Sequence, residues 1–495
     1  MQSSKKLIDP ALLYDSLQIL HKCFSEDCII TSYQILSEDE RRNVIVRLML
    51  HSPSGLAPAS VILKQSLPIK SEQIDDEKVE EENKRTFVRF SRDWSGIAFV
   101  TSLKQETHNV PSFYGANHEN CFILIEDLGN PHVSLVDSLI APNRQNAVSA
   151  LERYMRALGS FHAAGYGHTH EYVEILREIN PNAPSAQDEL KLMSTDLPSR
   201  LSEALAQDKI GILLSDNCQL EIQQVLEGVL NPGPFTVLTH GDLAPDNVFD
   251  HKGADGLQLI DFEACAVRNA LVDGINFRFS MPTGWCAKAI PQDIIERAEK
   301  IYRDELCKAI PAAKDDELYK LAYTQACAFH LLKQLTDINS CLDTNEIWRG
   351  PAIEGSLWNA KTNFLRPRFI SRLQTFIDVA TENNLYPAIR QMAAETLAKI
   401  KELWPDAKPL DFYPAFNTVS LQSKASSSGD INKCLGVTTS TTQLQHVEEV
   451  SHNEDREGVK QVAAPLSPPN DIKPSISSED TPVPTKSVSP SKPGK

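Results

Sequence analysis

Hydrophobic and polar positions alternate in three short segments near the N-terminus, a period typical of β-strands. These segments are 28–36, 43–50 and 59–65, and the charged residues 37–42 indicate a turn between the first two. The preceding residues 7–24 have apolar positions near helical spacing. The chain is therefore predicted to begin with a helix followed by a small, strand-rich region.

Helical spacing dominates after the third strand. The charged run 71–85 is most simply a solvated loop or the start of a helix, and 87–103 carries an apolar stripe at helical spacing. The remaining expected elements are a buried strand (121–125), a helical segment broken near Gly165 (147–176), a hairpin-like pair of strands (236–239 and 257–260) and a long helical region (291–403). A strand-rich part is thus followed by a larger helical part.

The composition changes near the C-terminus. Phe416 is the last aromatic residue, and the residues after it include 14 serines and 8 prolines. Such a segment cannot bury enough apolar surface to offset the entropy lost on ordering, so it is expected to be disordered. We therefore divide the chain into a helical segment (1–27), a strand-rich lobe (28–128), a helical lobe (129–410) and a disordered tail (411–495). The tail is a candidate for binding protein partners.

Composition limits the classes of function. The chain has 495 residues, 41% of them hydrophobic, and a net charge of −17. This balance excludes a wholly disordered chain and disfavours general binding to nucleic acid or to an anionic membrane. No apolar run is long enough to span a bilayer, no secretory signal is visible, and the ten cysteines form no C-x-x-C pair. A cytoplasmic protein with reduced thiols is expected.

The strongest chemical signal is a pair of motifs at the ends of two apolar segments. The first is His240-Gly-Asp-Leu-Ala-Pro-Asp-Asn247, and the second is Ile260-Asp-Phe-Glu263. Mg²⁺ prefers oxygen ligands, which Asn247 and Asp261 can supply. Asp242 is then left to orient an attacking hydroxyl and accept its proton. The motifs therefore predict a magnesium–nucleotide site.

This pair of motifs resembles the aminoglycoside phosphotransferase/choline-kinase-like family. The resemblance implies an α+β, two-lobed protein-kinase-like fold, with an antiparallel sheet and one helix in the N-lobe and a mostly helical C-lobe. It also implies ATP and Mg²⁺ as cofactors, with Asp242 as the catalytic base and Asn247 and Asp261 as metal ligands. Lys64, on the third strand, matches the lysine that contacts the nucleotide phosphates.

Two further assignments follow from the resemblance. Asp93 is the acid that best fits as the partner of Lys64, since it flanks the apolar stripe of the next helix. The segment Ile123-Leu-Ile-Glu-Asp-Leu-Gly129 matches the strand and hinge that hold adenine through their backbone, which makes Glu126 and Leu128 candidate nucleotide-binding residues. The implied activity is transfer of the γ-phosphoryl group of ATP to a hydroxyl group.

The departures from the family pattern bear on the substrate and on activity. Ala244 stands where protein kinases carry a lysine, the second motif reads Asp-Phe-Glu, and no A-P-E segment follows, so a small-molecule acceptor is favoured over a protein. The first strand turn, 37–43, has three acids and no glycine. The alternatives are therefore a catalytically weak or inactive kinase-like scaffold, and a protein kinase.

Overall fold

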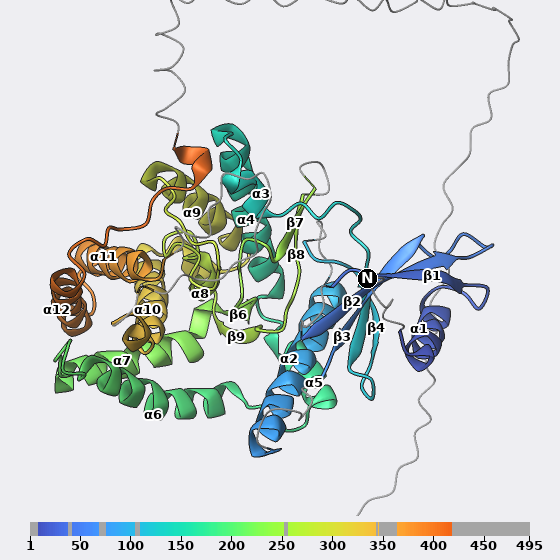
Figure 1. Ribbon diagram of the computed structural model, residues 1–495, viewed down its shortest axis with the longest axis horizontal. Coiled ribbons are helices and arrows are strands. Elements are labelled where there is room, and N and C mark those ends of the chain that lie inside the picture. The colour runs from blue at the N-terminus through green and yellow to red at the C-terminus, as the bar shows by residue number, and fades with distance from the viewer. Residues whose placement is uncertain are drawn as a thin grey trace, which may run out of the picture. The chain divides into compact units, whose positions relative to one another are not determined.

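The computed structural model describes residues 8–37, 42–68, 76–103, 109–251, 256–342, 345 and 364–417. Its N-terminal part contains a five-stranded antiparallel sheet in the order β1-β2-β3-β5-β4 (Figure 1). The strands are β1 (Ile29–Ile35), β2 (Asn43–His51), β3 (Ser60–Ser66), β4 (Phe113–Asn117) and β5 (Phe122–Glu126). Three of them confirm the strands predicted from the alternation, and β5 confirms the buried strand predicted at 121–125. The prediction missed β4, whose sequence Phe-Tyr-Gly-Ala-Asn alternates poorly and contains glycine and asparagine.

The two faces of the sheet pack against different helices. Successive side chains of a strand point to opposite faces. In β3, Val61 and Leu63 join a buried cluster with Leu12 and Leu20 of helix α1 (Pro10–Cys23). The opposite face, which includes Lys64, looks toward helix α2 (Asp76–Ser102). The alternation within β3 therefore decides which helix each of its side chains meets.

Helix α2 starts earlier than the apolar stripe suggested. The expectation of a helix over 87–103 was too short, because α2 already begins at Asp76. The first turns are polar, yet Glu80 pairs with Lys84 and Glu81 with Arg85, both at i,i+4 spacing. Such pairs stabilise a solvated helix without an apolar face, and an apolar pattern therefore misses it.

The chain beyond the sheet is mostly helical (Figure 1). The expected break near Gly165 is confirmed, since α4 ends there and α5 begins at Thr169. Within the described ranges, no helix has both the length and the apolar character needed to cross a membrane. The helices are α3 (Leu135–Ile140), α4 (Arg144–Gly165), α5 (Thr169–Ile179), α6 (Ala186–Leu205), α7 (Asp216–Leu230), α8 (Leu271–Gly274), α9 (Gln292–Leu306), α10 (Asp316–Leu335), α11 (Arg366–Glu382) and α12 (Pro387–Leu403).

Two short two-stranded sheets interrupt these helices and carry the motifs. The expected pairing of 236–239 with 257–260 is wrong. Instead β6 (Thr236–Thr239) pairs with β9 (Ala266–Asn269), and β7 (Val248–Asp250) pairs with β8 (Leu257–Leu259). Strands of three or four apolar residues carry no pattern that selects one partner over another. The observed pairing brings the two motifs together at the ends of β6, β7 and β8.

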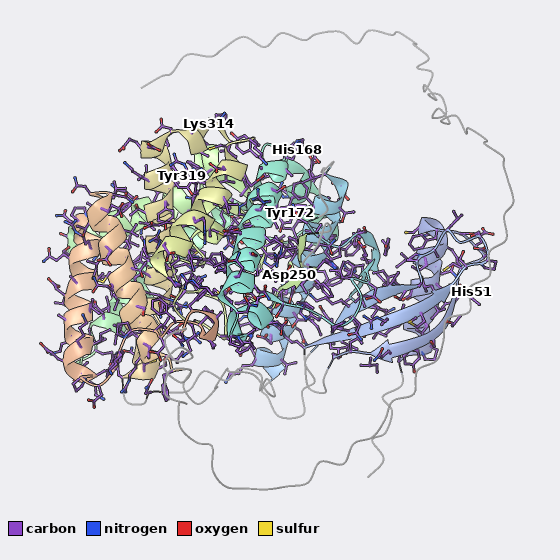
Figure 2. All side chains as sticks on the ribbon, turned by 90° about the horizontal axis from the view of Figure 1, so that it is seen from above. His51, His168, Tyr172, Asp250, Lys314 and Tyr319 are labelled. Atoms are coloured by element: carbon purple, nitrogen blue, oxygen red, sulfur yellow. The ribbon has the colours of Figure 1, made fainter. Side chains whose placement is uncertain are left out.

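A buried ion pair fastens the β7–β8 hairpin to the helical part. Asp250, at the end of β7, accepts hydrogen bonds from Arg153 of α4 at 2.7 and 2.9 Å. The Asp250 side chain is fully buried, and Figure 2 labels it near the middle of the view. Both guanidinium–carboxylate contacts form, which fixes the geometry as well as the charge. The hairpin is therefore held rigidly beside α4.

Helix α2 passes unusually close to the segment after β8. A Cβ atom added to Gly96 would lie 2.9 Å from both Cys265 Sγ and Phe262 Cβ. Only a residue without a side chain allows this approach. The contact sets how near α2 can come to Asp261.

We expect Gly96→Ala to lower the free energy of unfolding by about 1–3 kcal/mol, because the added methyl overpacks a closed contact. On an unconstrained helix the same change would stabilise by about 1 kcal/mol. Urea denaturation measures the difference. Gly165→Ala is the control, since its Cβ would meet Phe99 at an ordinary 3.6 Å. Equal or greater stability of the Gly96 variant would contradict the close approach.

Candidate active site

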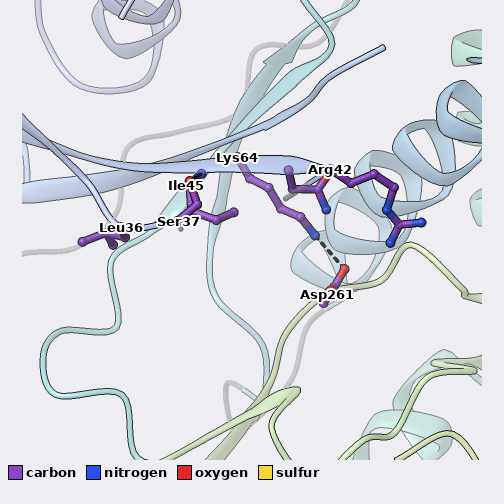
Figure 3. Close-up of a pocket in the computed structure, with 7 residues that line it drawn as sticks. Leu36, Ser37, Arg42, Ile45, Lys64 and Asp261 are labelled. Atoms are coloured by element: carbon purple, nitrogen blue, oxygen red, sulfur yellow. Dashed lines mark hydrogen bonds and ion pairs between the residues drawn. The ribbon is translucent and has the colours of Figure 1, made fainter. Parts of the chain in front are cut away.

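Lys64 occupies the centre of the sheet on the face toward α2. Its neighbours across the strands are Ile45 of β2 and Ile123 of β5. Its Nζ lies 2.7 Å from Asp93 Oδ2 of α2 and 2.6 Å from Asp261 Oδ1 (Figure 3). The lysine side chain is only 10% exposed. One ammonium group thus joins the sheet, α2 and the segment after β8.

Asp261 has an unusual backbone conformation. Its φ is +72°, in the left-handed region that a residue with a side chain rarely adopts. The next backbone N–H, that of Phe262, donates to Asp93 Oδ1 at 2.8 Å. Such strain persists where surrounding contacts impose it, as it does at many functional sites. Here Asp93 binds both Lys64 and the backbone beside Asp261, and so fixes their relative position.

Lys64 and Asp261 stabilise each other's charged forms. Burial alone disfavours the charged form of Lys64, but Asp261 and Asp93 outweigh burial and raise the pKa of the ammonium group. Burial likewise disfavours the charge of Asp261, but Lys64 holds the pKa of that carboxyl below its usual 3.8. At neutral pH the cluster therefore contains a protonated Lys64 and an ionised Asp261.

A cavity of about 460 Å³ opens beside this cluster (Figure 3). The described residues that line it are Leu36, Ser37, Arg42, Asn43, Ile45, Lys64 and Asp261. Arg42 also forms an ion pair with Glu263 at 2.7 Å, which links the first strand turn to the second motif. The acidic residues 38–40 of that turn, together with Arg41, lie outside the described residues. The cavity is large enough for a phosphate chain and has a cation on its inner wall.

The loop after β6 is anchored by a buried carboxylate. Asp273 of α8 accepts from the backbone N–H groups of His240 at 2.6 Å and Gly241 at 3.2 Å. His162 of α4 contacts the same carboxylate at 3.3 Å. The Nε2 of His240 lies 2.9 Å from the carbonyl oxygen of Ile260. These bonds hold the loop against the strand that ends in Asp261.

Asp242 is the carboxylate of this loop that remains for chemistry. Burial raises the pKa of Asp242 above the usual 3.8, while Thr283 and His240 partly oppose that increase. A raised pKa brings a carboxylate closer to the range useful for a general base. The charge of Asp261 raises the pKa of Asp242 further, and Asp242 is not among the described residues that line the cavity at Lys64.

Asn247 and Asp261 lie at neighbouring ends of the β7–β8 hairpin. The N–H of Ile260 donates to the carbonyl oxygen of Asn247 at 3.1 Å. The Asn247 side-chain nitrogen donates to the carbonyl oxygen of Asp242 at 2.9 Å, which leaves its amide oxygen as the group available for a cation. The described residues contain no cluster of three His, Cys, Asp or Glu side chains that could hold a metal by themselves. Two oxygen ligands fit Mg²⁺, which usually completes its shell with phosphates and water.

Glu126 and Leu128 are not among the described residues that line the cavity. The Glu126 carboxylate accepts from the backbone N–H and the hydroxyl of Ser112, at 3.0 and 2.9 Å. Between them, Asp127 pairs with Arg47 of β2 and accepts from Ser60 of β3. The segment after β5 is therefore tied to the sheet. A role of its backbone in holding adenine stays a prediction.

The sequence analysis missed Asp273 and Thr283. Both act on the loop: Asp273 accepts hydrogen bonds from its backbone, and Thr283 lowers the pKa of Asp242. Asp273 is 12 residues beyond Asp261, in Leu-Val-Asp-Gly, where a single acid in an apolar stretch is the available signal. Thr283 follows Met-Pro, in a segment with no regular period. Its role could not be read from the sequence.

The region that contains this cluster matches a known protein family. Residues 59–284 match the ecdysteroid kinase-like family. The matched region includes Lys64, Asp93, Asp242, Asn247 and Asp261. The resemblance to kinase-like phosphotransferases is therefore confirmed, and the antiparallel sheet followed by mostly helical structure is the kinase-like fold expected from it.

Several solved structures are similar to this kinase-like chain at low identity. An ethanolamine kinase from Plasmodium vivax is 13% identical, with a TM-score of 0.36, and the match covers 79% of this chain and 93% of that one. A choline kinase from Cryptosporidium parvum is 13% identical, with a TM-score of 0.34 and coverage of 79% and 96%. An ADP-bound aminoglycoside phosphotransferase is 12% identical, with a TM-score of 0.36 and coverage of 76% and 100%. No individual curated protein matches the chain by sequence.

We expect Lys64→Met to destabilise the protein by about 3 kcal/mol at pH 7, because it leaves two largely buried carboxylates without their cation. Asp261 has a lowered pKa in the folded state, so its stabilising contribution is present above the unfolded pKa and is lost as pH falls through the folded value. The stability gap between wild type and variant should therefore shrink below about pH 4.

Urea denaturation across this pH range measures the gap. Lys84→Met is the matched control, because it removes an ion pair whose side chains are 73% and 69% exposed. Exposed pairs contribute little, so the control should be indistinguishable from wild type. A Lys64 variant with wild-type stability at pH 7 would show that the cluster does not hold the three segments together.

Proposed function

We propose that this protein is an ATP-dependent small-molecule kinase that transfers the γ-phosphoryl group to a hydroxyl acceptor. The main support is the cluster formed by Lys64, Asp93 and Asp261. Lys64 and Asp261 of this cluster line the 460 Å³ cavity. The match of this region to a kinase-like family supports small-molecule kinase activity in general. The choice of ATP, of magnesium and of the individual roles is our proposal.

In this proposal the nucleotide phosphates lie in the cavity against Lys64. The protonated ammonium offsets phosphate charge without needing to move, because Asp93 and Asp261 already hold it. Asn247 and Asp261 would hold Mg²⁺, which supplies further charge neutralisation at the phosphates when bound. We also propose that the backbone near Glu126 and Leu128 holds the adenine. Residues 28–128 would then form the nucleotide-binding lobe and 129–410 the acceptor-binding lobe.

Asp242 would orient the acceptor hydroxyl and take its proton. The acceptor oxygen forms a new bond to the γ-phosphorus, the bond from that phosphorus to the β-phosphate oxygen breaks, and ADP leaves with the electron pair. The released proton goes to Asp242. The chemistry depends on positioning and charge rather than on a covalent enzyme intermediate. The hydrogen bonds from Asp273 to the loop backbone supply the required rigidity.

Two carboxylate variants separate binding from chemistry. Asp261→Asn should abolish the increase in melting temperature that Mg·ATP produces in wild type. Asp242→Asn should keep that increase but lower turnover by about 10²–10⁴-fold, since it removes general-base catalysis. Turnover is measured as ADP release with a library of hydroxyl compounds. Asp304→Asn, an exposed change on α9, is the matched control.

The outcomes distinguish this proposal from the alternatives. No thermal shift with millimolar Mg·ATP in wild type would favour the non-catalytic scaffold. Phosphate transfer to polypeptides but to no small molecule would favour a protein kinase. Unchanged turnover in Asp242→Asn would remove this residue from the role of base.

The pH dependence tests the environment of Asp242. A base works in its deprotonated form, so kcat/KM should fall as pH drops through the raised pKa of Asp242. Thr283→Val removes the hydroxyl group that lowers this pKa. The acidic limb of the kcat/KM profile should therefore move to higher pH in the variant. A limb that stays in place, or moves to lower pH, would contradict this assignment.

A further inference from the structure

A second cavity, of about 330 Å³, borders the catalytic loop on the helical side. Gly241 of the loop and Thr283 both line it. Gly241 directly precedes Asp242 in the chain, and the Thr283 side chain lowers the pKa of Asp242, so the cavity borders the proposed base. No described residue lines both this cavity and the one at Lys64. The second cavity is therefore a separate compartment that reaches the reacting groups from the other side.

Its lining carries an excess of positive charge. Arg268, Lys333, Arg368 and Arg372 contribute cations, while Asp337 is the single acid among the described lining residues. Asp337 is 73% exposed, and it pairs at 3.8 Å with Arg200, a residue that does not line the cavity. The cavity therefore differs in sign from the protein as a whole, whose net charge is −17.

Arg372 and Arg268 of this lining donate hydrogen bonds to neutral groups. Arg372 donates to the carbonyl oxygens of Phe279 at 2.8 Å and Ser280 at 3.2 Å. Arg268 donates to the Thr239 hydroxyl at 2.6 Å and to the Ala264 carbonyl at 3.3 Å. Arg268 also feels the charges of Asp273 and Glu189, whereas the acceptors of Arg372 are neutral carbonyl groups that satisfy its N–H groups without balancing its charge. A buried charge in that state is costly.

The titration behaviour of the cavity agrees with this picture. Burial, with the neighbouring Arg368, lowers the pKa of Arg372 to about 9. Burial also lowers the pKa of Arg268. His330, which lines the same cavity, is neutral, because burial lowers its pKa to about 3. These cations repel one another, and a bound anion would relieve that repulsion.

We propose that the phosphoryl acceptor is a hydroxyl compound that also carries an anionic group, and that this cavity binds that group. Phosphate, sulfate and carboxylate share the relevant chemistry, which is a planar or tetrahedral set of oxygens that guanidinium and ammonium groups recognise. The claim that the bound compound is the phosphoryl acceptor rests on the proposed kinase function. The anion site itself rests only on the cavity and its cations.

Anion binding is tested first without nucleotide. Inorganic phosphate and sulfate are titrated into wild type, Lys333→Met and Lys320→Met, with melting temperature and calorimetric Kd as readouts. Lys333 is exposed enough to be replaced without loss of the fold, and Lys320 is an exposed lysine on the same helix, paired with Glu317. We expect binding to weaken about tenfold in Lys333→Met and to stay unchanged in Lys320→Met. Absence of binding in wild type, or equal binding in both variants, overturns the proposal.

Turnover then tests the acceptor class with matched pairs. Glycerol is compared with glycerol 3-phosphate, and glucose with glucose 6-phosphate and glucose 6-sulfate, as ADP release with Mg·ATP. The anionic member of at least one pair should be used at least tenfold better, with a raised KM in Lys333→Met. A uniform preference for the neutral member overturns the proposal.

The two proposals fail in different ways. An Mg·ATP thermal shift that depends on Asp261, together with no anion binding, removes the anion site and leaves the kinase function. Anion binding that depends on Lys333, with no response to Mg·ATP, removes the kinase function and leaves the anion site.

Discussion

A lysine ammonium that is largely buried between two carboxylates is stable only if the fold brings all three groups into contact. Lys64 comes from β3, Asp93 from α2 and Asp261 from the end of the β7–β8 hairpin. Each contributing element has its own reason to be there: strand alternation, helical spacing, and the bond from the Phe262 N–H to Asp93. The remaining features of the site are arranged around this contact, because it joins the sheet to the helical part beside both motifs.

Much of the architecture could be predicted from the periodicity of the sequence. Alternation located β1, β2 and β3, a short apolar run located β5, and helical spacing with a glycine-rich break located the end of α4 and the start of α5. What failed was pairing. The short strands β6 and β8 have equally apolar partners available, and their choice of β9 and β7 depends on the packing of helices around them. A polar helix start, as in α2, is likewise invisible to an apolar pattern.

The residues of the candidate site likewise include some that the sequence predicted and others that it did not. The side chains named from the motifs and the apolar stripe, Lys64, Asp93 and Asp261, do come together. The residues that hold the loop act through backbone groups or through partners distant in the sequence. Asp273 is one such residue. The cations of the second cavity come from β9, α10 and α11, and they too converge from distant parts of the sequence. Convergence of that kind follows from tertiary packing, which one sequence does not encode in any local pattern.

The ion pair between Arg42 and Glu263 has a consequence of a different kind. It spans the first strand turn and the segment after Asp261, and the Arg42 side chain is 42% exposed. Attraction between exposed charges is screened by dissolved salt within about 8–10 Å, whereas the largely buried contact of Lys64 is screened far less. Rising ionic strength should therefore weaken the Arg42–Glu263 contact at the rim of the cavity, while the contacts of Lys64 on its inner wall persist. Entry of a ligand should then depend on salt concentration more than the arrangement of the inner wall does.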